Sequence, residues 1–307
     1  MDIRELREAD LPAVLALCQR ALHLDTFSLP MLRRRVLLEP NRKPAYQLCL
    51  WDGPRLIGIM MGGTRHLADR PGLFHRGGLM GTLILFAIDP EYRRRGLGWQ
   101  LLATLEDRMR DDRLGWLRVG NFGPDYIWPG LDVRYTPGVC LLLSRGFKHR
   151  GDAINMEVDL SARDWDTEAD EARLYRQGYT IKRLHVSERQ PFSEWVEPTW
   201  GPMWHWEAMS TLDNDPVSTF IAVKDGKIVG FASYNATGFP NCFSPTGTAE
   251  QQRRAGLGRV LFYRCMHDLR ELGHTHAEIC WVGPVVYYAK IADAAISRVF
   301  YWFEKEL

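Results

Sequence analysis

The sequence predicts an α/β fold that occurs twice within a chain of 307 residues. The main observation is a ten-residue stretch at 93–102 that recurs at 253–262 with two Arg, two Gly and two Leu in common. Each copy follows a β-rich apolar run and precedes a run with helical spacing, which is the order of an α/β unit. The copies lie 160 residues apart (256 − 96), far more than the roughly 20–50 residues of a solenoid unit, so they indicate a duplicated domain.

Each copy of the stretch is a glycine-rich loop that leads into a helix. Unpaired N–H groups and the positive end of the dipole make a helix N-terminus favourable for anions. Glycines allow φ > 0 and a close approach to a ligand, and arginine guanidinium groups suit phosphate oxygens. The predicted pyrophosphate-binding residues are Arg93, Arg94, Arg95, Gly96, Leu97 and Gly98 in the first loop and Arg253, Arg254, Ala255, Gly256, Leu257 and Gly258 in the second.

The spacing within the loops narrows the choice of phosphate ligand. The dinucleotide pattern G-x-G-x-x-G is absent because Leu101 stands at its third glycine, and the P-loop pattern is absent too. The spacing R-x-x-G-x-G, read from Arg93 and again from Arg253, resembles the coenzyme A pyrophosphate loop of the GNAT superfamily of N-acyltransferases. The alternative is a basic turn that only caps a surface helix, and two copies in matching contexts favour the resemblance.

The resemblance implies a fold and a cosubstrate for nearly the whole chain. It implies two tandem GNAT-like domains, each a mixed, mostly antiparallel sheet that is flanked by helices and splays at the strand before the glycine loop. Acetyl-CoA is then the expected cosubstrate, and it enters the gap between the splayed strands. Further cofactor contacts are expected at the ends of these strands, at Ile88, Gly247 and Thr248.

Composition limits the other classes of function. The net charge is +1, so no overall charge favours nucleic acid or an acidic membrane surface. No apolar run approaches the roughly 20 residues that span a bilayer, and the N-terminus does not resemble a signal peptide. Six cysteines without a C-x-x-C pair suggest free thiols in a reducing cytosol, and we expect a cytoplasmic protein. No metal site is expected, because His274 and His276 have no third ligand at a suitable spacing.

Apolar spacing and turn residues predict the elements of the first half. Asp10 and Pro12 are placed to begin a helix, and Asp52-Gly53 is placed to close a hairpin. Gly146 follows the last helix, as expected of a residue at C′. The predicted elements are an edge strand at 2–6, a helix at 10–22, a hairpin at 46–60, a Gly- and Arg-rich loop at 65–78, a strand at 82–88, a helix after the first loop, a strand at 117–119, a helix at 139–144 and a hairpin from 147 to 160.

A proline-rich insert at 122–137 interrupts this order. Its three prolines exclude a regular helix or a central strand, and its aromatic side chains need a surface to pack on. One interpretation is a lid or a wall of a substrate site, and the other is a plug between domains. Because buried aromatic residues mostly serve packing, the plug is the simpler expectation.

The second half repeats this order after an acidic linker at 161–171. Asp225-Gly226, followed by a basic residue, two aliphatic residues and glycine, matches the hairpin of the first half. Four tryptophans between 195 and 206 suit a core, an interface or the wall of an acyl or amine site. The predicted elements are a strand at 180–184, helical segments within 191–212, a hairpin at 220–231, a helix after the second loop, a strand at 277–281, a helix from 283 and a closing strand at 297–303.

The two halves differ at the residue that the resemblance makes the general acid. In the GNAT family a tyrosine in the helix after the next strand protonates the departing CoA thiolate. Tyr288 stands at that position in the second half, whereas Leu142 stands there in the first and has no proton to donate. We therefore expect a catalytically degenerate N-terminal domain at 1–160 and a catalytic C-terminal domain at 161–307. A tyrosine that only packs in its helix is the alternative for Tyr288.

The expected reaction is direct transfer of an acetyl group to a primary amine of a small molecule, in a ternary complex. A neutral amine attacks the thioester carbonyl, and a backbone N–H near Thr248 stabilises the oxyanion. Glu207 and Glu250 are both candidate bases for the amine, directly or through water. The nucleophile pattern G-x-S-x-G is absent, so no covalent intermediate is required.

Two alternatives stay open from the sequence, and a third is disfavoured. An amino-sugar thiol acetyltransferase of the mycothiol-synthase kind also fits a tandem plan with activity in the second half. A non-catalytic acyl-CoA-binding module fits the loops, although Tyr288 argues against it. A nucleic-acid- or histone-directed protein lacks the required charge. The acceptor is expected to bind variable loops, at 191–212, at 235–243 and at the 122–137 insert, in a monomer or a homodimer.

Overall fold

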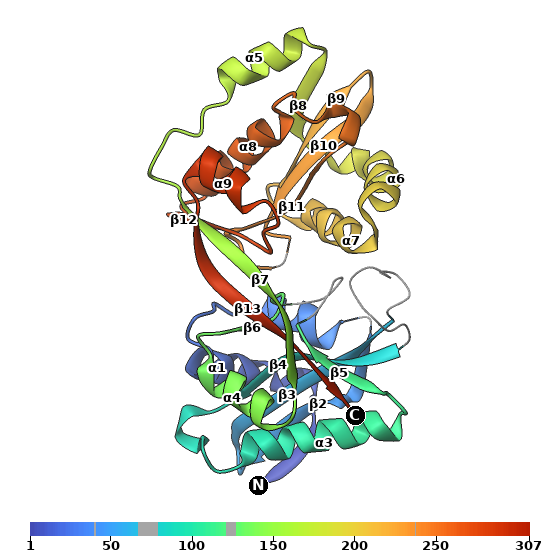
Figure 1. Cartoon of the computed structure of the whole chain (residues 1–307), viewed down its shortest axis with the longest axis vertical. Helices are drawn as coiled ribbons and strands as arrows, with labels where there is room; N and C mark the ends of the chain where they lie inside the picture. Colours follow the sequence, from blue (N-terminus) through green and yellow to red (C-terminus); the bar gives the residue numbers. More distant parts are fainter. Residues whose placement is uncertain (40, 67–78, 121–126, 237) are drawn as a thin grey trace. The chain divides into compact units, whose positions relative to one another are not determined.

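The computed structural model describes residues 1–39, 41–66, 79–120, 127–236 and 238–307. Contacts group these residues into two compact units, and Figure 1 shows the elements of each. The first unit contains Met1–Ala153 together with Val299–Leu307, and the second contains Ile154–Arg298. Each unit has the order strand, glycine loop, helix and strand, so the predicted duplicated α/β fold is confirmed. The predicted loop at 65–78 lies almost wholly outside the described residues.

The sheet of the first unit is mostly antiparallel and has one parallel pair. β3 pairs with β4 antiparallel, whereas β4, the strand before the glycine loop, pairs with β5 parallel. The predicted edge strand is confirmed because β1 stands at the end of the strand order. Across this sheet the strands are β1 (Asp2–Glu5), β2 (Arg42–Asp52), β3 (Arg55–His66), β4 (Leu79–Ile88), β5 (Trp116–Val119) and β13 (Ala295–Glu306), and β6 (Leu131–Asp132) pairs with β13.

Helix α3 (Leu97–Asp111) follows the first loop and supplies much of the core of the first unit. Its residues Leu101, Leu105 and Met109 recur every four positions and are fully buried. Glycine lets the helix approach the sheet closely, since a Cβ on Gly81 would lie 2.5 Å from the Met109 sulfur. The other helical segments are η1 (Glu8–Asp10), α1 (Leu11–Ala21), α2 (Leu29–Leu32), η2 (Arg33–Leu37), η4 (Pro90–Tyr92) and α4 (Thr136–Ser144).

Strand β13 completes the sheet of the first unit. It pairs antiparallel with β5 over 303–306, and its residues Phe300 and Phe303 are fully buried. The Lys305 ammonium donates to both carboxylate oxygens of Glu106 on α3, at 2.6 and 2.7 Å. The closing strand predicted at 297–303 is therefore confirmed, and its partner is a strand of the first half.

Strand β7 (Lys148–Asp159) is the other strand that contributes to both units. It is one continuous strand of 12 residues, so the hairpin predicted from 147 to 160 is wrong. The strand continues through Gly151, where the Trp302 ring lies so close that a Cβ would be 3.2 Å from it. The domain boundary between residues 160 and 161 remains a prediction. Grouping by contacts assigns Ala153 to the first unit and Ile154 to the second.

The second unit repeats the arrangement around its own glycine-loop strand, β11. β10 pairs with β11 antiparallel, and β12 pairs with it parallel. β9 and β10 form the hairpin predicted at Asp225-Gly226. Across this sheet the strands are β7, β12 (His276–Ile279), β11 (Cys242–Thr248), β10 (Lys227–Tyr234), β9 (Thr219–Lys224) and β8 (Tyr179–Arg183).

Helix α8 (Leu257–Glu271) takes the place of α3 in the second unit. Its residues Leu261, Cys265 and Leu269 again recur every four positions and are fully buried. Part of the predicted acidic linker is helical, because α5 begins at Glu168. The other helical segments are α5 (Glu168–Arg176), η5 (Val186–Glu188), α6 (Arg189–Trp200), α7 (Pro202–Ser210), η6 (Thr211–Asp213), η7 (Glu250–Gln252) and α9 (Val285–Ala292).

Candidate active site

Both glycine loops have the same backbone conformation. Gly96 has φ +80° and Gly256 has φ +95°, a region that glycine adopts without steric cost. Arg94 and Arg254, two residues earlier, also have positive φ, at 62° and 72°. Each loop follows a short 3-10 turn and opens α3 or α8, as predicted. The unpaired N–H groups of the first helical turn therefore favour an anion at each loop.

The strand before each loop parts from its parallel neighbour at equivalent positions. The last paired residues are Leu83 and Val119 in the first unit and Phe243 and Ile279 in the second. Both differences (243 − 83 and 279 − 119) equal 160, the spacing of the loops themselves. β4 and β11 each continue for five residues beyond these pairs, so the predicted splay is confirmed in both units.

The strand ends lie beside the second glycine of each loop. A Cβ on Gly98 would lie 3.6 Å from Ile88 Cγ1, and a Cβ on Gly258 would lie 3.9 Å from Thr248 Oγ1. The structure thus brings Ile88 and Thr248 to the loops, where the sequence analysis places cofactor contacts. Those contacts remain a prediction.

The first arginine of each loop makes different contacts. Arg93 Nε donates to the Ile88 carbonyl at 3.1 Å, and Arg93 Nη2 donates to the Ala21 carbonyl at 3.0 Å. Arg253 instead lies 3.9 Å from the Glu250 carboxylate, and its side chain is 58% exposed. Arg93 therefore holds the first loop in shape, whereas Arg253 leaves its charge at the surface.

Arg173 of α5 covers the second loop. Its Nη1 donates to the Ala255 carbonyl at 3.1 Å, and its Nη2 lies 2.9 Å from the position of a Cβ on Gly256. At Gly96 no atom of the described residues lies within 4 Å of the equivalent position. The first loop is therefore open, and the second is partly covered.

A cavity of about 60 Å³ lies at the splay of the first unit. The Tyr135 hydroxyl, on its wall, donates to Asp25 at 2.7 Å and accepts the Leu24 N–H at 3.0 Å. A second carboxylate on the wall, Asp132, is held by the Arg134 guanidinium at 2.7 Å. The apolar wall includes Phe27, Leu83, Leu85, Phe86 and Trp128. The cavity therefore combines apolar walls with two carboxylates and a phenol.

The proline-rich insert contributes to this cavity. From Ile127 onward its described residues line the cavity wall, and Trp128 stacks on Phe300 with 5.7 Å between ring centroids. Residues 122–126 lie outside the described part of the chain. The described part of the insert therefore forms a wall of this cavity, and both interpretations of the insert, a wall of a substrate site and a plug between domains, remain predictions.

The equivalent splay of the second unit is covered by Trp200. A Cβ on Gly247 of β11 would lie 2.5 Å from Trp200 Cζ2, so the indole ring lies directly on the strand. Trp204 stacks on Trp200 with 5.0 Å between ring centroids. The Trp200 indole N–H is buried and has no hydrogen-bond partner among the described residues. The tryptophan cluster therefore lies on the strand face where the sequence analysis placed a cofactor contact.

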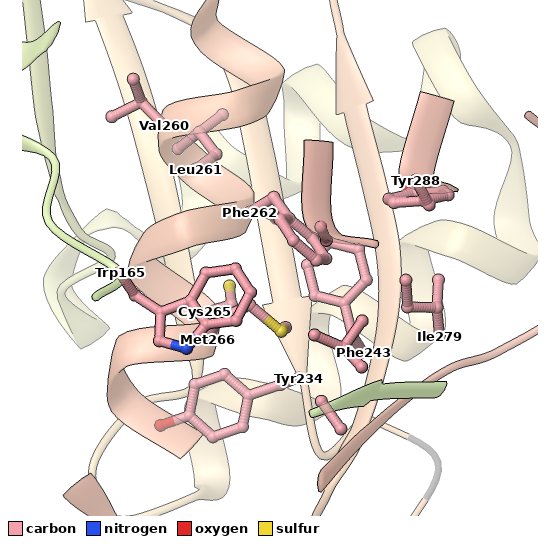
Figure 2. Close-up of a cluster of buried hydrophobic side chains, with 14 of the residues drawn as sticks. Trp165, Tyr234, Phe243, Val260, Leu261, Phe262, Cys265, Met266, Ile279 and Tyr288 are labelled. Atoms are coloured by element: carbon pink, nitrogen blue, oxygen red, sulfur yellow. The ribbon is translucent and has the colours of Figure 1, made fainter. Parts of the chain in front are cut away.

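Tyr288, the predicted general acid, lies in the core of the second unit. It is 5% exposed, and Figure 2 shows its ring beside Phe243 and Phe262, at 6.2 and 5.5 Å between centroids. Burial raises the pKa of the Tyr288 hydroxyl well above its usual value, which weakens it as a proton donor. The role of Tyr288 as an acid stays a prediction, and it requires the thiolate to reach this cluster.

Tyr287, which the sequence analysis did not single out, reaches the second loop. A Cβ on Gly258 would lie 3.1 Å from the Tyr287 hydroxyl, whereas a Cβ on Gly98 would lie 3.3 Å from a methyl group of Leu141. Burial raises the pKa of Tyr287 to about 12. The two tyrosines are adjacent in the sequence, but the spacing rule selected only the second of them.

The two candidate bases of the second half have different surroundings. Glu207 on α7 is almost fully buried, whereas Glu250 in η7 is exposed at the surface beside Arg253. Among the described residues no group of three or more His, Cys, Asp and Glu side chains could hold a metal ion. None of the helices in this part of the chain could cross a membrane.

Solved structures share this fold at low sequence identity. A tandem GNAT protein from the clavulanic acid biosynthesis pathway has a TM-score of 0.69 and 16% identity, with 99% of this chain and 98% of that chain covered. A GCN5-related N-acetyltransferase from Sphaerobacter thermophilus has a TM-score of 0.66 and 15% identity, with 99% and 95% covered. A glucosamine N-acetyltransferase region of a fungal multi-domain GH3 β-N-acetylglucosaminidase has a TM-score of 0.75 and 14% identity, with 99% and 38% covered, so this chain spans little over a third of that protein.

Sequence comparison identifies the family. No curated protein sequence matches this chain. The sequence profile of the acetyltransferase (GNAT) family matches residues 5–122 and again 181–285, which together make up more than half of the chain. Each matched region contains one glycine loop and the strand before it. The chain therefore belongs to the GNAT acetyltransferase family and carries its domain twice, as the sequence analysis predicted.

Proposed function

We propose that the chain is an acetyl-CoA-dependent N-acyltransferase that moves an acetyl group to a primary amine of a small molecule. In this proposal acetyl-CoA binds at the first glycine loop, and its thioester reaches the splay between β4 and β5. The observation that carries the proposal is the cavity at that splay. Residues of β4 line this cavity, and β4 leads into the open glycine loop. In the second unit, Trp200 covers the equivalent splay and Arg173 covers the equivalent glycine loop.

The free edge of β4 offers what the thioester needs. β4 no longer pairs with β5 beyond Leu83, so an N–H between 84 and 88 can donate to the thioester oxygen as negative charge develops. The amine would occupy the cavity, where the Asp25 carboxylate can accept its proton. The neutral amine then attacks the carbonyl carbon directly, the attacking nitrogen loses its extra proton to water as the C–S bond breaks, and no acyl-enzyme forms.

The leaving CoA sulfur has no side-chain acid in this half. Leu141 and Leu142 stand where the second half has two tyrosines, and a leucine donates no proton. A thiol has a pKa of about 8.5, so its thiolate is a tolerable leaving group near neutral pH. Water then protonates the departed thiolate.

A second arrangement places the reaction in the second half, as the sequence analysis expected. The observation in its favour is the Tyr287 hydroxyl beside Gly258, with Tyr288 next to it. This arrangement requires Trp200 to leave Gly247. The unpartnered indole N–H makes its present position less favourable, since such a buried group costs about 1–3 kcal/mol.

Charge reversal at one matched position in each loop separates the two arrangements. Arg94 and Arg254 are exposed, have positive φ and lie 160 residues apart (254 − 94), so their variants are equivalent. We expect Arg94→Glu to weaken acetyl-CoA binding about tenfold or more by calorimetry, because it places a carboxylate beside the pyrophosphate. Arg94→Gln keeps the shape without the negative charge and should weaken binding less. Arg254→Glu and Arg254→Gln should bind as the wild type does.

The opposite pattern would transfer the cofactor site to the second half. Loss of one of two binding events in each glutamate variant would indicate two working sites. If the wild-type protein binds no acetyl-CoA, the acyltransferase proposal is wrong. If it binds acetyl-CoA but releases no CoA with a panel of primary amines, it is a non-catalytic acyl-CoA-binding module. Glucosamine belongs in that panel because one structural relative is named as a glucosamine N-acetyltransferase region.

A further inference from the structure

The cavity at the splay of the first unit differs in polarity from the same region of the second unit. Residues 83–86 of β4 line the cavity, and they are Leu, Ile, Leu and Phe. The residues 160 positions later (243 − 83), at 243–246 of β11, are Phe, Ser, Pro and Thr. The apolar strand at the first splay is therefore a property of this cavity, and the duplicated fold does not require it.

Contacts with neighbouring elements hold the apolar wall of the cavity in a fixed shape. The Trp128 ring stacks on Phe300 of β13 with 5.7 Å between ring centroids. The Phe86 ring lies against the first turn of α4, where a Cβ on Gly138 would be 3.3 Å from Phe86 Cζ. The wall is therefore packed from behind, and an occupant of the cavity has to match its shape.

The polar groups on the cavity wall already have partners within the protein. Both Asp132 oxygens accept from the Arg134 guanidinium, and one of them also accepts the Arg134 N–H at 2.9 Å. The Tyr135 hydroxyl donates to Asp25 and accepts the Leu24 N–H. Hydroxyl groups on an occupant would lie mostly against apolar side chains, and a buried hydroxyl without a partner is unfavourable. An ammonium group is favoured, because the Asp25 carboxylate attracts its charge at short range.

The volume of the cavity limits the size of the group that it can hold. An apolar cavity of about 150 Å³ holds a benzene ring. The cavity of the first unit measures about 60 Å³, so it holds an apolar group of roughly three carbon atoms. A branched alkyl group of the size of isopropyl fits this space, whereas an aromatic ring or a sugar ring exceeds it.

We propose that the acetyl acceptor is a small aliphatic primary amine with a branched alkyl group and with neither a carboxylate nor a hydroxyl, an inference that rests on the proposed acyl transfer in the first unit. The alkyl group occupies the cavity against Leu85 and Phe86, and the ammonium group pairs with Asp25. A carboxylate on the same molecule would meet the negative charge of Asp25, and hydroxyl groups would be buried in the apolar wall.

The transfer of the acetyl group balances with this acceptor. The ammonium nitrogen gives one proton to Asp25 and, after it has attacked the thioester carbonyl, a second proton to water. The C–N bond of the amide forms and the C–S bond of the thioester breaks. The electron pair of the C–S bond stays on the CoA sulfur, and the products are the N-acetylated amine and CoA.

Isobutylamine and two matched relatives test this class of acceptor through kcat/KM for the release of CoA. 1-Amino-2-propanol replaces one methyl group of isobutylamine by a hydroxyl, and valine adds a carboxylate to the carbon next to the nitrogen. We expect kcat/KM to be about 10- to 100-fold lower for 1-amino-2-propanol than for isobutylamine, and more than about 100-fold lower for valine. Glucosamine and benzylamine carry rings, and their kcat/KM should be at least about tenfold lower.

Phe86→Ala tests whether the cavity itself makes this selection. The substitution removes a ring from the wall and enlarges the cavity, so the kcat/KM ratio of benzylamine to isobutylamine should rise about tenfold or more. Phe86→Leu removes less volume and should raise the same ratio by less. Leu79→Ala is the control on the same strand, because Leu79 is 51% exposed and does not line the cavity, and its ratio should equal that of the wild type. Thermal melts establish that each variant is folded at the temperature of the assay.

The outcomes distinguish this inference from the proposed function. If any of the four other amines reacts as efficiently as isobutylamine with the wild type, the acyltransferase proposal stands and the acceptor class is refuted. If isobutylamine is preferred but folded Phe86→Ala leaves the benzylamine ratio unchanged, the cavity does not select the acceptor and the inference is refuted. If the wild type binds acetyl-CoA but releases no CoA with any of the five amines, the acyl transfer and the acceptor class are refuted together.

Discussion

Replacing Phe303 by alanine will destabilise the first unit. This unit consists of Met1–Ala153 and Val299–Leu307, so Phe303 lies 150 positions after the end of the N-terminal segment of the unit (303 − 153). Phe303 is fully buried on β13, and its backbone pairs with Val119 of β5. Phe→Ala changes in protein cores cost about 3–5 kcal/mol, because the lost burial is accompanied by a cavity. Since domains are stable by about 5–15 kcal/mol, we expect the loss of about a fifth or more of the stability of the first unit.

Hydrogen exchange followed by mass spectrometry locates the loss, because it measures opening segment by segment. In Phe303→Ala the amides of β2 and β3 should exchange faster, by about two to four orders of magnitude, whereas those of β9 and β10 should keep most of their protection. Ile296→Ala is the matched control on the same strand, since Ile296 is 54% exposed and its loss should cost less than about 0.5 kcal/mol. Equal loss of protection in β9 and β10 would refute the assignment of β13 to the first unit.

Three further predictions concern single side chains. Trp200→Ala should uncover Gly247 and raise the number of acetyl-CoA molecules bound per chain from one to two; an unchanged number would show that Trp200 is not what closes the second splay. The Arg4 guanidinium donates to the Asp10 carboxylate at 2.7 Å and lowers the pKa of that carboxyl in the folded protein. The ion pair therefore stabilises the fold at every pH above the pKa of Asp10 in the unfolded chain, which is about 3.9. This stabilisation is lost as the pH falls through the lower pKa of Asp10 in the folded protein. Asp10→Asn should therefore be about 1.5–3 kcal/mol less stable than the wild type at pH 7, and thermal melts should show this difference in stability narrowing as the pH falls below the unfolded pKa of about 3.9; a difference that stays constant at low pH would contradict this linkage. Ellman's reagent should modify Cys140 quickly and the other five thiols slowly, since only Cys140 is exposed and burial raises the pKa of Cys18 to about 12; rapid modification of more than one thiol would contradict this order.

The repeated parts of the chain were the most predictable from sequence. The loops at Gly96 and Gly256 are local features, in which glycine at positive φ, a preceding strand and a following helix are all encoded within about fifteen residues. The duplication of the loops predicted the same fold for both halves, because each copy lies between a strand and a helix in the same order. The hairpin at Asp225-Gly226 was predictable for the same reason.

Contacts between residues distant in sequence were not predictable. Nothing local to Phe303 indicates that its strand pairs with β5, and nothing local to Arg163 indicates that its guanidinium donates to the Ile291 carbonyl of α9. The choice of Tyr288 over Tyr287 followed a spacing rule, whereas their exposure depends on how α9 packs on Phe243 and Phe262. The position of Trp200 on Gly247 likewise depends on the path of α6.

The late position of β13 in the chain has a consequence for protein synthesis. β5 ends at Val119, but the part of β13 that belongs to the first unit begins at Val299, 180 residues later (299 − 119). At about 5–20 residues per second, the ribosome needs roughly 10–40 s to synthesise the intervening residues. During this time the nascent first half carries an unpaired strand edge at β5, and such edges invite association with other chains. The growing chain is therefore most in need of a chaperone after its first glycine loop has been made and before its final strand emerges.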